Sequence, residues 1–215
     1  MKRFHIKIVL WLAIICLSYL VYSSIKDEMN FESDSKLRLA ENIQKLKDLR
    51  KLQMEYEKVY DFYANDFASL ISFYNNDSVP IVKMIWDEKK HEEYIKNEEA
   101  EDLTDEQAIK LGILTKDTTL VLAKDIVYDD QYLKTRNIKY PLLIEELSMI
   151  PFTDKEYNIQ SGSINKGNVI VQVFQISATY RDIFNNLPIE NRKGLDKLLK
   201  VGSMTEASLN GNWGE

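Results

Sequence analysis

The chain has 215 residues and a mass of 25.2 kDa, which is enough for one ordinary domain plus an appendage. Its 45% hydrophobic and 29% charged residues exclude a disordered chain and a membrane protein with many spans. Acidic residues outnumber basic ones by 34 to 28, and this balance argues against nucleic acid as the main partner.

An uncharged apolar run, IVLWLAIICLSYLVYSSI, fills residues 8–25. These 18 residues come close to what a helix rising about 1.5 Å per residue needs to cross a bilayer core of roughly 30 Å. We therefore predict a transmembrane helix over residues 8–25. Lys2, Arg3 and Lys7 precede it, and positive residues favour the cytoplasmic side. We expect residues 1–7 to be a cytoplasmic tail and the rest to lie in the periplasm, anchored in a bacterial inner membrane.

A cleaved signal peptide would share these basic and apolar regions. However, residues 19–22 are Tyr-Leu-Val-Tyr, where cleavage would need small residues. A lipoprotein would use Cys16, but Ile15 stands where a small residue should precede it. Cys16 is the only cysteine, so the exported part has no disulfide and no thiol chemistry. Without the basic tail, 25 basic residues remain against 34 acidic ones, and the charge of −9 also disfavours anionic lipid headgroups as partners.

A polar juncture is predicted over residues 26–35, followed by a long amphipathic helix and a short helix over residues 36–78. No Gly or Pro interrupts the helical spacing of the apolar residues until the short helix has ended. Asn65-Asp66 is expected to break the helix, with Asp66 capping the second one. The apolar positions are Leu39, Ile43, Leu46, Leu49, Tyr56, Tyr60, Tyr63 and Phe67.

This apolar stripe divides into two candidate surfaces. The half nearer the membrane, Leu39, Ile43, Leu46 and Leu49, precedes the folded domain, so we expect it to be bare and to recruit a partner helix. The aromatic half, Tyr56, Tyr60, Tyr63 and Phe67, is either an exposed platform for a ligand or subunit, or a core stripe that packs on the domain's own sheet. The core interpretation is favoured.

Residues 79–215 are predicted to form one exported domain, rich in mainly antiparallel strands with short helices, so the fold class is α+β. Thr104 and Gln107 form a capping box for a short helix that Gly112 ends. The acidic segment before it is interpreted as a solvated loop or surface helix. Predicted strands cover Val79–Trp86, Thr118–Tyr128 and Tyr140–Phe152, and a mixed structure is the alternative for the last.

The clearest supersecondary signal is a β-hairpin formed by EYNIQSGSI and VIVQVFQISATY, which residues 165–168, Asn-Lys-Gly-Asn, separate. Its second strand is apolar on both faces, which predicts burial on both sides. The remaining tail is expected to give one or two short helices and a closing strand or loop.

Residues that carry chemistry are scarce. His5 and His91 are the only histidines, and the chain has no Gly-x-Ser-x-Gly elbow, phosphate-binding loop or Cys/His metal spacing. We therefore expect no cofactor, no metal site and no catalytic residues. Glu145-Glu146 interrupts an apolar run, but a surface position explains this pair better than a catalytic dyad.

The stretch RLAENIQKLKDLRKLQMEYEKVYDFYANDFASLISFY, after an apolar N-terminus, resembles the extended first helix of type IV pilins and type II secretion pseudopilins. That resemblance implies a filament subunit with a small β-rich domain. The start, MKRFHIKIVLWLAIICL, lacks the family's Gly before the apolar run and its acidic residue within it. The whole chain, with MIPFTDKEYNIQSGSINKGNVIVQVF and LKVGSMTEASLNGNW, resembles uncharacterised single-pass envelope proteins of the Bacteroidota type, which implies no activity.

The predicted function is a non-enzymatic, single-pass scaffold or assembly subunit of an envelope complex for secretion, motility or envelope assembly. Its expected partners are other membrane or envelope proteins, a further copy of the chain, and the bilayer around residues 8–25. The alternatives are a pilin-like filament subunit, and an envelope enzyme or small-ligand binder that uses carboxylates.

Overall fold

A computed structural model describes residues 2–97, 103–136, 141–189 and 193–214 of the chain. It has the α+β class that the sequence predicts: a long N-terminal helix, then antiparallel sheets with short helices. By contacts the chain divides into two units, residues 1–50 with 137–215 (unit 1) and residues 51–136 (unit 2). This division differs from the predicted single domain over residues 79–215.

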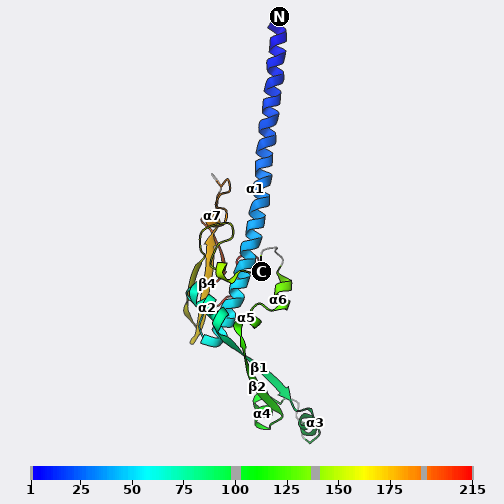
Figure 1. The fold of residues 1–215 in the computed structure, drawn as a ribbon, viewed down its shortest axis with the longest axis vertical. Coiled ribbons are helices and arrows are strands. Elements are labelled where there is room, and N and C mark those ends of the chain that lie inside the picture. The colour runs from blue at the N-terminus through cyan, green and yellow to red at the C-terminus, as the bar shows by residue number, and fades with distance from the viewer. Residues whose placement is uncertain (1, 98–102, 137–140, 190–192, 215) are drawn as a thin grey trace. The chain divides into compact units, whose positions relative to one another are not determined.

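The helices, in chain order, are α1 (Lys2–Tyr60), α2 (Phe67–Asn76), α3 (Glu88–Asn97), α4 (Asp105–Lys110), α5 (Ala123–Ile126), α6 (Asp130–Thr135), the 3-10 helix η1 (Ile144–Glu146) and α7 (Tyr180–Ile183) (Figure 1). The strands are β1 (Ser78–Trp86), β2 (Leu114–Leu122), β3 (Asn158–Lys166), β4 (Val169–Thr179) and β5 (Leu198–Gly202).

Helix α1 runs without a break over 59 residues, so residues 26–35, predicted as a polar juncture, are part of the helix. Residues 2–60 contain no Gly or Pro, and the Lys36 ammonium bonds the Glu32 carboxylate one turn earlier, at 2.6 Å. The helix ends where Asp61 adopts a left-handed backbone with φ 62°. As predicted, Asp66 then caps α2 by accepting the Ser69 N–H at 2.7 Å.

Unit 1 contains an antiparallel sheet with the strand order β3-β4-β5, and β4 lies alongside α1 (Figure 1). The β3–β4 hairpin is confirmed, with Lys166 opposite Val169 and the turn at Gly167-Asn168. Both turn residues have positive φ, 60° and 70°, as a two-residue hairpin turn requires. Burial on both faces of β4 holds only for its second half.

Unit 2 contains a two-stranded ribbon in which β1 pairs with β2 over nine positions. Helices α2 and α5 lie at one end of this ribbon, and α3 and α4 lie at the other (Figure 1). At the α4 end, Ala108, Ile113 and Leu114 form a small core. The predicted capping box is present, because the Thr104 hydroxyl accepts the Gln107 N–H while the Gln107 side chain accepts the Thr104 N–H.

Two predicted strands are corrected. Over Thr118–Tyr128 the strand ends at Leu122, because the chain turns into α5 where the Ala123 N–H bonds the Asp77 carbonyl. Over Tyr140–Phe152 the described residues form η1 and turns instead of a strand, and Tyr140 itself lies outside them. Pro141 and Pro151 flank this segment without an N–H to donate, and its Leu147 and Ile150 are buried in the core.

Candidate functional site

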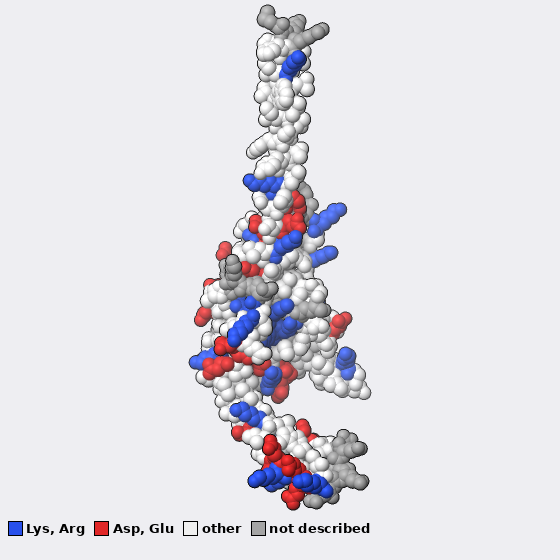
Figure 2. Space-filling model, turned by 90° about the vertical axis from the view of Figure 1, so that its right-hand side faces the viewer, with Lys and Arg blue, Asp and Glu red and all other residues white. Residues whose placement is uncertain are grey.

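The N-terminal part of α1 is apolar and exposed. Every described side chain from residue 8 to residue 22 is exposed, and Figure 2 shows this stretch as a nearly uncharged shaft. By length and composition α1 is long and apolar enough to cross a membrane. Nothing else in the described part of the chain has both properties. The predicted anchor, residues 8–25, therefore has the surface that contact with lipid tails requires.

Contacts between α1 and the rest of unit 1 begin soon after the apolar run. The Phe31 ring meets the Phe184 ring edge to face, with centroids 6.0 Å apart. Phe31 follows Ile25 by six residues, so about 9 Å of helix separates them. A headgroup layer is roughly 5–8 Å thick, so a membrane around residues 8–25 would have unit 1 at its surface.

The prediction of a bare partner-helix face on α1 is wrong, because its side chains are buried or half-buried. Leu46 and Leu49 are 0% exposed, and Leu39 and Ile43 are half-buried. The expectation of a bare stripe assumed that the folded domain begins after this part of the helix. Residues 137–215 instead return to α1 and cover the stripe, so these side chains are taken up by the chain's own core.

Polar side chains also hold α1 in unit 1. The Arg38 guanidinium donates to the carbonyls of Ile183 and Asn185, and it lies 5.2 Å from the centre of the Phe152 ring.

One turn further along α1, the buried Asn42 accepts the Tyr157 hydroxyl at 2.6 Å. Arg50 donates to the Leu209 carbonyl at 3.2 Å. Each of these bonds joins α1 to a segment more than 100 residues away in sequence, so α1 is a structural part of unit 1.

Three charged residues of α1 lie on its covered side. Asp48 is 0% exposed and accepts the Gln44 amide, whereas Glu41 has one oxygen, Oε2, without a hydrogen-bond partner among the described residues. Burial raises the pKa of Glu41. Burial also lowers the pKa of Lys45 to about 8, although Glu146, Asp48 and Glu41 oppose this shift.

The predicted aromatic face lies in unit 2 and is mostly core. Tyr56 and Tyr63 are each 8% exposed, Phe67 is half-buried and Tyr60 is exposed. The Tyr56 ring meets the Phe73 ring at 5.3 Å, in the edge-to-face geometry that aromatic pairs favour.

Tyr60 and Gln53 complete this region of unit 2. The Tyr60 hydroxyl donates to Asp77 at 2.5 Å, and this hydrogen bond is the main cause that raises the pKa of Tyr60 to about 12. The buried Gln53 side chain makes two 2.9 Å bonds with the backbone of Ala64, which accounts for a polar residue within the apolar stripe. The aromatic side chains and Gln53 thus join α1 to the loop and helix that follow it.

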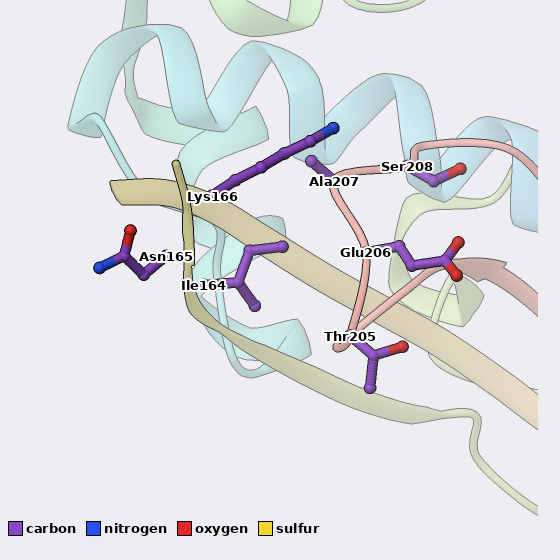
Figure 3. Close-up of a pocket in the computed structure, with 7 residues that line it drawn as sticks. All are labelled: Ile164, Asn165, Lys166, Thr205, Glu206, Ala207 and Ser208. Atoms are coloured by element: carbon purple, nitrogen blue, oxygen red, sulfur yellow. The ribbon is translucent and has the colours of Figure 1, made fainter. Parts of the chain in front are cut away.

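A hollow of about 360 Å³ lies between the end of β3 and the loop after β5, and Figure 3 shows the residues that line it. Ile164 and Lys166 extend toward that loop, and Asn165 points to the other side of the strand, as the alternation of a strand requires (Figure 3). The loop lines the hollow with Thr205, Glu206, Ala207 and Ser208. The Glu206 carboxylate points away from Lys166, so the two charges do not converge on one point (Figure 3).

A second hollow of about 330 Å³ lies on the polar face of the same sheet, where Glu156 and Asp182 flank amide and hydroxyl side chains. Asp182 is already bonded to Lys155 and Thr179, and both bonds lower its pKa against the effect of burial. Glu145 and Glu146 are exposed on η1 and line neither hollow. Within the described ranges, no group of three His, Cys, Asp or Glu side chains could hold a metal ion.

The β1–β2 ribbon also carries an exposed apolar surface, which none of the predicted interaction surfaces includes. Val82, Met84, Trp86, Leu120 and Leu122 are between 39% and 70% exposed. The ladder places all five on one face, because Pro80 faces Leu120, Val82 faces Thr118, and successive residues alternate. The apolar run VPIVKMIW was the available signal, but it predicts only a strand and does not indicate an interaction surface.

Comparison of the chain with protein-family models, with curated proteins and with solved structures gave no match.

Proposed function

We propose that the protein is a non-enzymatic, single-pass scaffold of a bacterial envelope complex, with its N-terminus in the cytoplasm and the chain beyond residue 25 in the periplasm. The supporting observation is the continuity of α1, which has exposed apolar side chains over residues 8–22 and fully buried ones at Leu46 and Leu49. Membrane anchor and domain core are thus parts of one rigid helix.

This arrangement suits a structural role, in which the protein holds other proteins at the membrane, better than it suits catalysis. A helix without Gly, Pro or a break has no hinge, so movement of the anchor would be passed directly to unit 1. An enzyme needs converging acids, bases or nucleophiles, and in both described hollows the charged groups either point apart or are already paired.

Orientation can be tested with single cysteines, because Cys16 is the only native one. In a Cys16→Ser background, Lys197→Cys should react with a membrane-impermeant maleimide in cells whose outer membrane is permeabilised. Lys7→Cys should react only after the inner membrane is opened. Both native side chains are exposed, so each variant is expected to fold. Release by alkaline carbonate, or loss of residues 8–25 from the mature chain, would refute a retained anchor.

The scaffold role requires stable protein partners. Crosslinking of intact cells, followed by purification of the full-length protein in detergent, should recover the same envelope proteins each time. A variant with residues 8–25 replaced by an unrelated spanning sequence is the control, since it keeps the anchor but changes its surface. Recovery of no reproducible partner from crosslinked membranes would refute the scaffold role.

A pilin-like filament subunit is the second candidate, and the same helix favours it. An exposed apolar half and a buried half packed against an antiparallel sheet would suit assembly through the N-terminal helix. The mass of the mature protein discriminates between the two functions: an intact N-terminus supports the scaffold, and removal of the basic tail supports filament assembly.

A further inference from the structure

We propose that the free edge of β2 is a strand-addition site, which binds an extended segment of a partner protein with apolar side chains on one face and an acidic one opposite Lys116. This names the chemistry of the partner and so rests on the proposed scaffold function.

The ribbon lacks the neighbours that usually stabilise paired strands. Within the described part of the chain its sheet has two strands, and helices contact it at its ends, near Val79 and near Leu114. The middle of the ribbon is exposed on both faces, apart from the half-buried Ile81 and Val121. An isolated pair of strands is marginally stable in water, and a third strand would complete the sheet.

The direction of the backbone groups follows from the hydrogen bonds at the two ends of the ladder. The Ala123 N–H bonds the Asp77 carbonyl, and the Asp87 N–H bonds the Ile113 carbonyl. These two pairs extend the β1–β2 ladder by one position at each end, in the same register. Odd-numbered pairs are therefore the hydrogen-bonded ones. In the even-numbered pairs the N–H and C=O groups point away from the partner strand, so those of Lys116, Thr118 and Leu120 point toward the outer edge of β2.

The two edges of the ribbon are not equivalent. Pro80 is an even-numbered residue of β1, so the outer edge of β1 lacks a donor at that point. A proline at this position is a common protection against strand pairing. Strand β2 contains no proline, so each of its outward-pointing residues has an N–H to donate. The edge of β2 is the one that can accept a further strand.

The area of the apolar face favours an added strand over a second folded copy. The five exposed apolar side chains present about 500 Å², at roughly 200 Å² each and about half exposed. A stable interface between folded proteins buries about 800 Å² on each partner. Strand addition needs less, because main-chain hydrogen bonds supply affinity while alternate side chains supply specificity.

The charges of the ribbon specify the partner's side chains. On the odd-numbered face Lys83 lies opposite Asp117, so these charges already match. On the apolar face the cross-strand neighbour of Lys116 is Met84, which has no charge. An added strand would place one side chain opposite Lys116 and the next ones opposite Thr118 and Leu120. Opposite charge at the first position and apolar groups at the other two would complement the edge.

A synthetic peptide tests the site without knowledge of the native partner. The probe is acetylated Thr-Val-Thr-Val-Thr-Glu-Thr, which in antiparallel register sets its valines opposite Leu120 and Thr118 and its glutamate opposite Lys116. The target is the full-length protein in detergent. Hydrogen exchange followed residue by residue should show slower exchange at Lys116, Thr118 and Leu120, with no change at Val82 and Met84.

A matched pair of proline variants locates the edge. Thr118→Pro and Val82→Pro change two residues that face each other in the ladder, and both N–H groups point outward. Thr118→Pro should weaken peptide binding at least about tenfold, since it removes a donor at the centre of the edge. Val82→Pro should bind as the wild type does. Circular dichroism checks that both variants keep the ribbon.

Reversing the charge of residue 116 and of the peptide tests the same site without a proline, which could disturb the strand. Lys116→Glu should weaken the glutamate peptide about two- to fivefold and strengthen binding of a peptide with lysine in place of the glutamate by a similar factor. No binding of either peptide at roughly 1 mM, or protection at the edge of β1, would overturn the proposal. A dimer in the absence of peptide that Thr118→Pro dissociates would overturn it in favour of a second copy.

The peptide-binding test and the scaffold test can fail independently of each other. Peptide binding uses purified protein and needs no native partner. An unchanged set of crosslinked partners in Thr118→Pro would overturn the site and leave the scaffold role standing. Absence of any partner in the wild type would refute the scaffold role whatever the peptide does.

Discussion

The two β-hairpins of this protein differ in what covers them. The β3–β4 hairpin and the β1–β2 ribbon are both antiparallel and each has nine paired positions. The first gains a third strand, β5, and Ile176 and Phe174 become almost fully buried. Within the described ranges the second has only its two strands, and Val82 and Leu120 stay more than half exposed. Apolar residues in a strand thus show that it has a face to cover, but not whether its own chain covers that face.

The chain's three tryptophans allow the two hairpins to be followed separately. Trp86 lies in the ribbon beside the His91 ring, and Trp213 lies close to Gly211, which bridges to Val201 of β5. In a Trp11→Phe background, replacing one of the remaining two with phenylalanine leaves a fluorescence signal from one hairpin only. Denaturant titration of each reporter protein then gives a free energy of unfolding for each unit.

Truncation of one apolar side chain in each hairpin should give the largest difference. Ile176→Ala removes buried methyl groups and leaves a cavity, so it should cost about 2–4 kcal/mol in the Trp213 signal. Leu120 is 70% exposed, so Leu120→Ala should cost less than about 0.5 kcal/mol in the Trp86 signal. A loss above about 2 kcal/mol for Leu120→Ala would contradict an open ribbon face.

Two glycines test the packing of the three-stranded sheet at a finer scale. Gly202 has φ 74°, and a Cβ there would lie 2.3 Å from the Phe174 carbonyl oxygen. Gly202→Ala should therefore cost roughly 2–3 kcal/mol through strain and displacement of β4. Gly167 has φ 60° but open space around it, so Gly167→Ala should cost only about 1 kcal/mol of backbone strain. Equal losses would show that the sheet yields where β5 meets β4.

The smallest effect is a dependence on pH that only unit 1 should show. The pKa of Lys45 falls from 10.5 to about 8 on folding, so between these values the unfolded chain binds more protons than the folded one. Stability must then rise as the pH increases from about 8. The comparison ends at about pH 9.5, because burial raises the pKa of Tyr157 and its ionisation in the unfolded chain then acts in the opposite direction.

Lys45→Met is the control for this pH dependence. It should be more stable than the wild type at pH 7 and should lose the rise above pH 8, because it has no charge to bury. The Trp213 signal reports the change, and the Trp86 signal should not follow it. A wild-type stability that falls between pH 8 and pH 9.5 would contradict the buried position of Lys45.

Several local features were predictable from the sequence because neighbouring residues determine them. Thr104 and Gln107 specify the start of α4, Asp66 caps α2, and Gly167-Asn168 turns the hairpin, since each needs only its own hydrogen bonds or backbone angles. The long helix was also predictable from the absence of Gly and Pro. The polar juncture predicted at residues 26–35 is helical, because a polar stretch with helix-forming spacing continues a helix as well as it ends one.

Burial was decided by the tertiary structure, because a side chain is covered by segments that are far away in sequence. The sequence shows that Leu46 and Leu49 form an apolar stripe, but residues 137–215 must return to α1 to cover it. In the same way, VPIVKMIW predicts a strand, and its apolar face stays open because no described segment packs over the middle of the ribbon. The sequence by itself determined where this chain forms helices, turns and strands. Long-range packing decided that the predicted partner face is core and that the apolar face of the predicted strand Val79–Trp86 is surface.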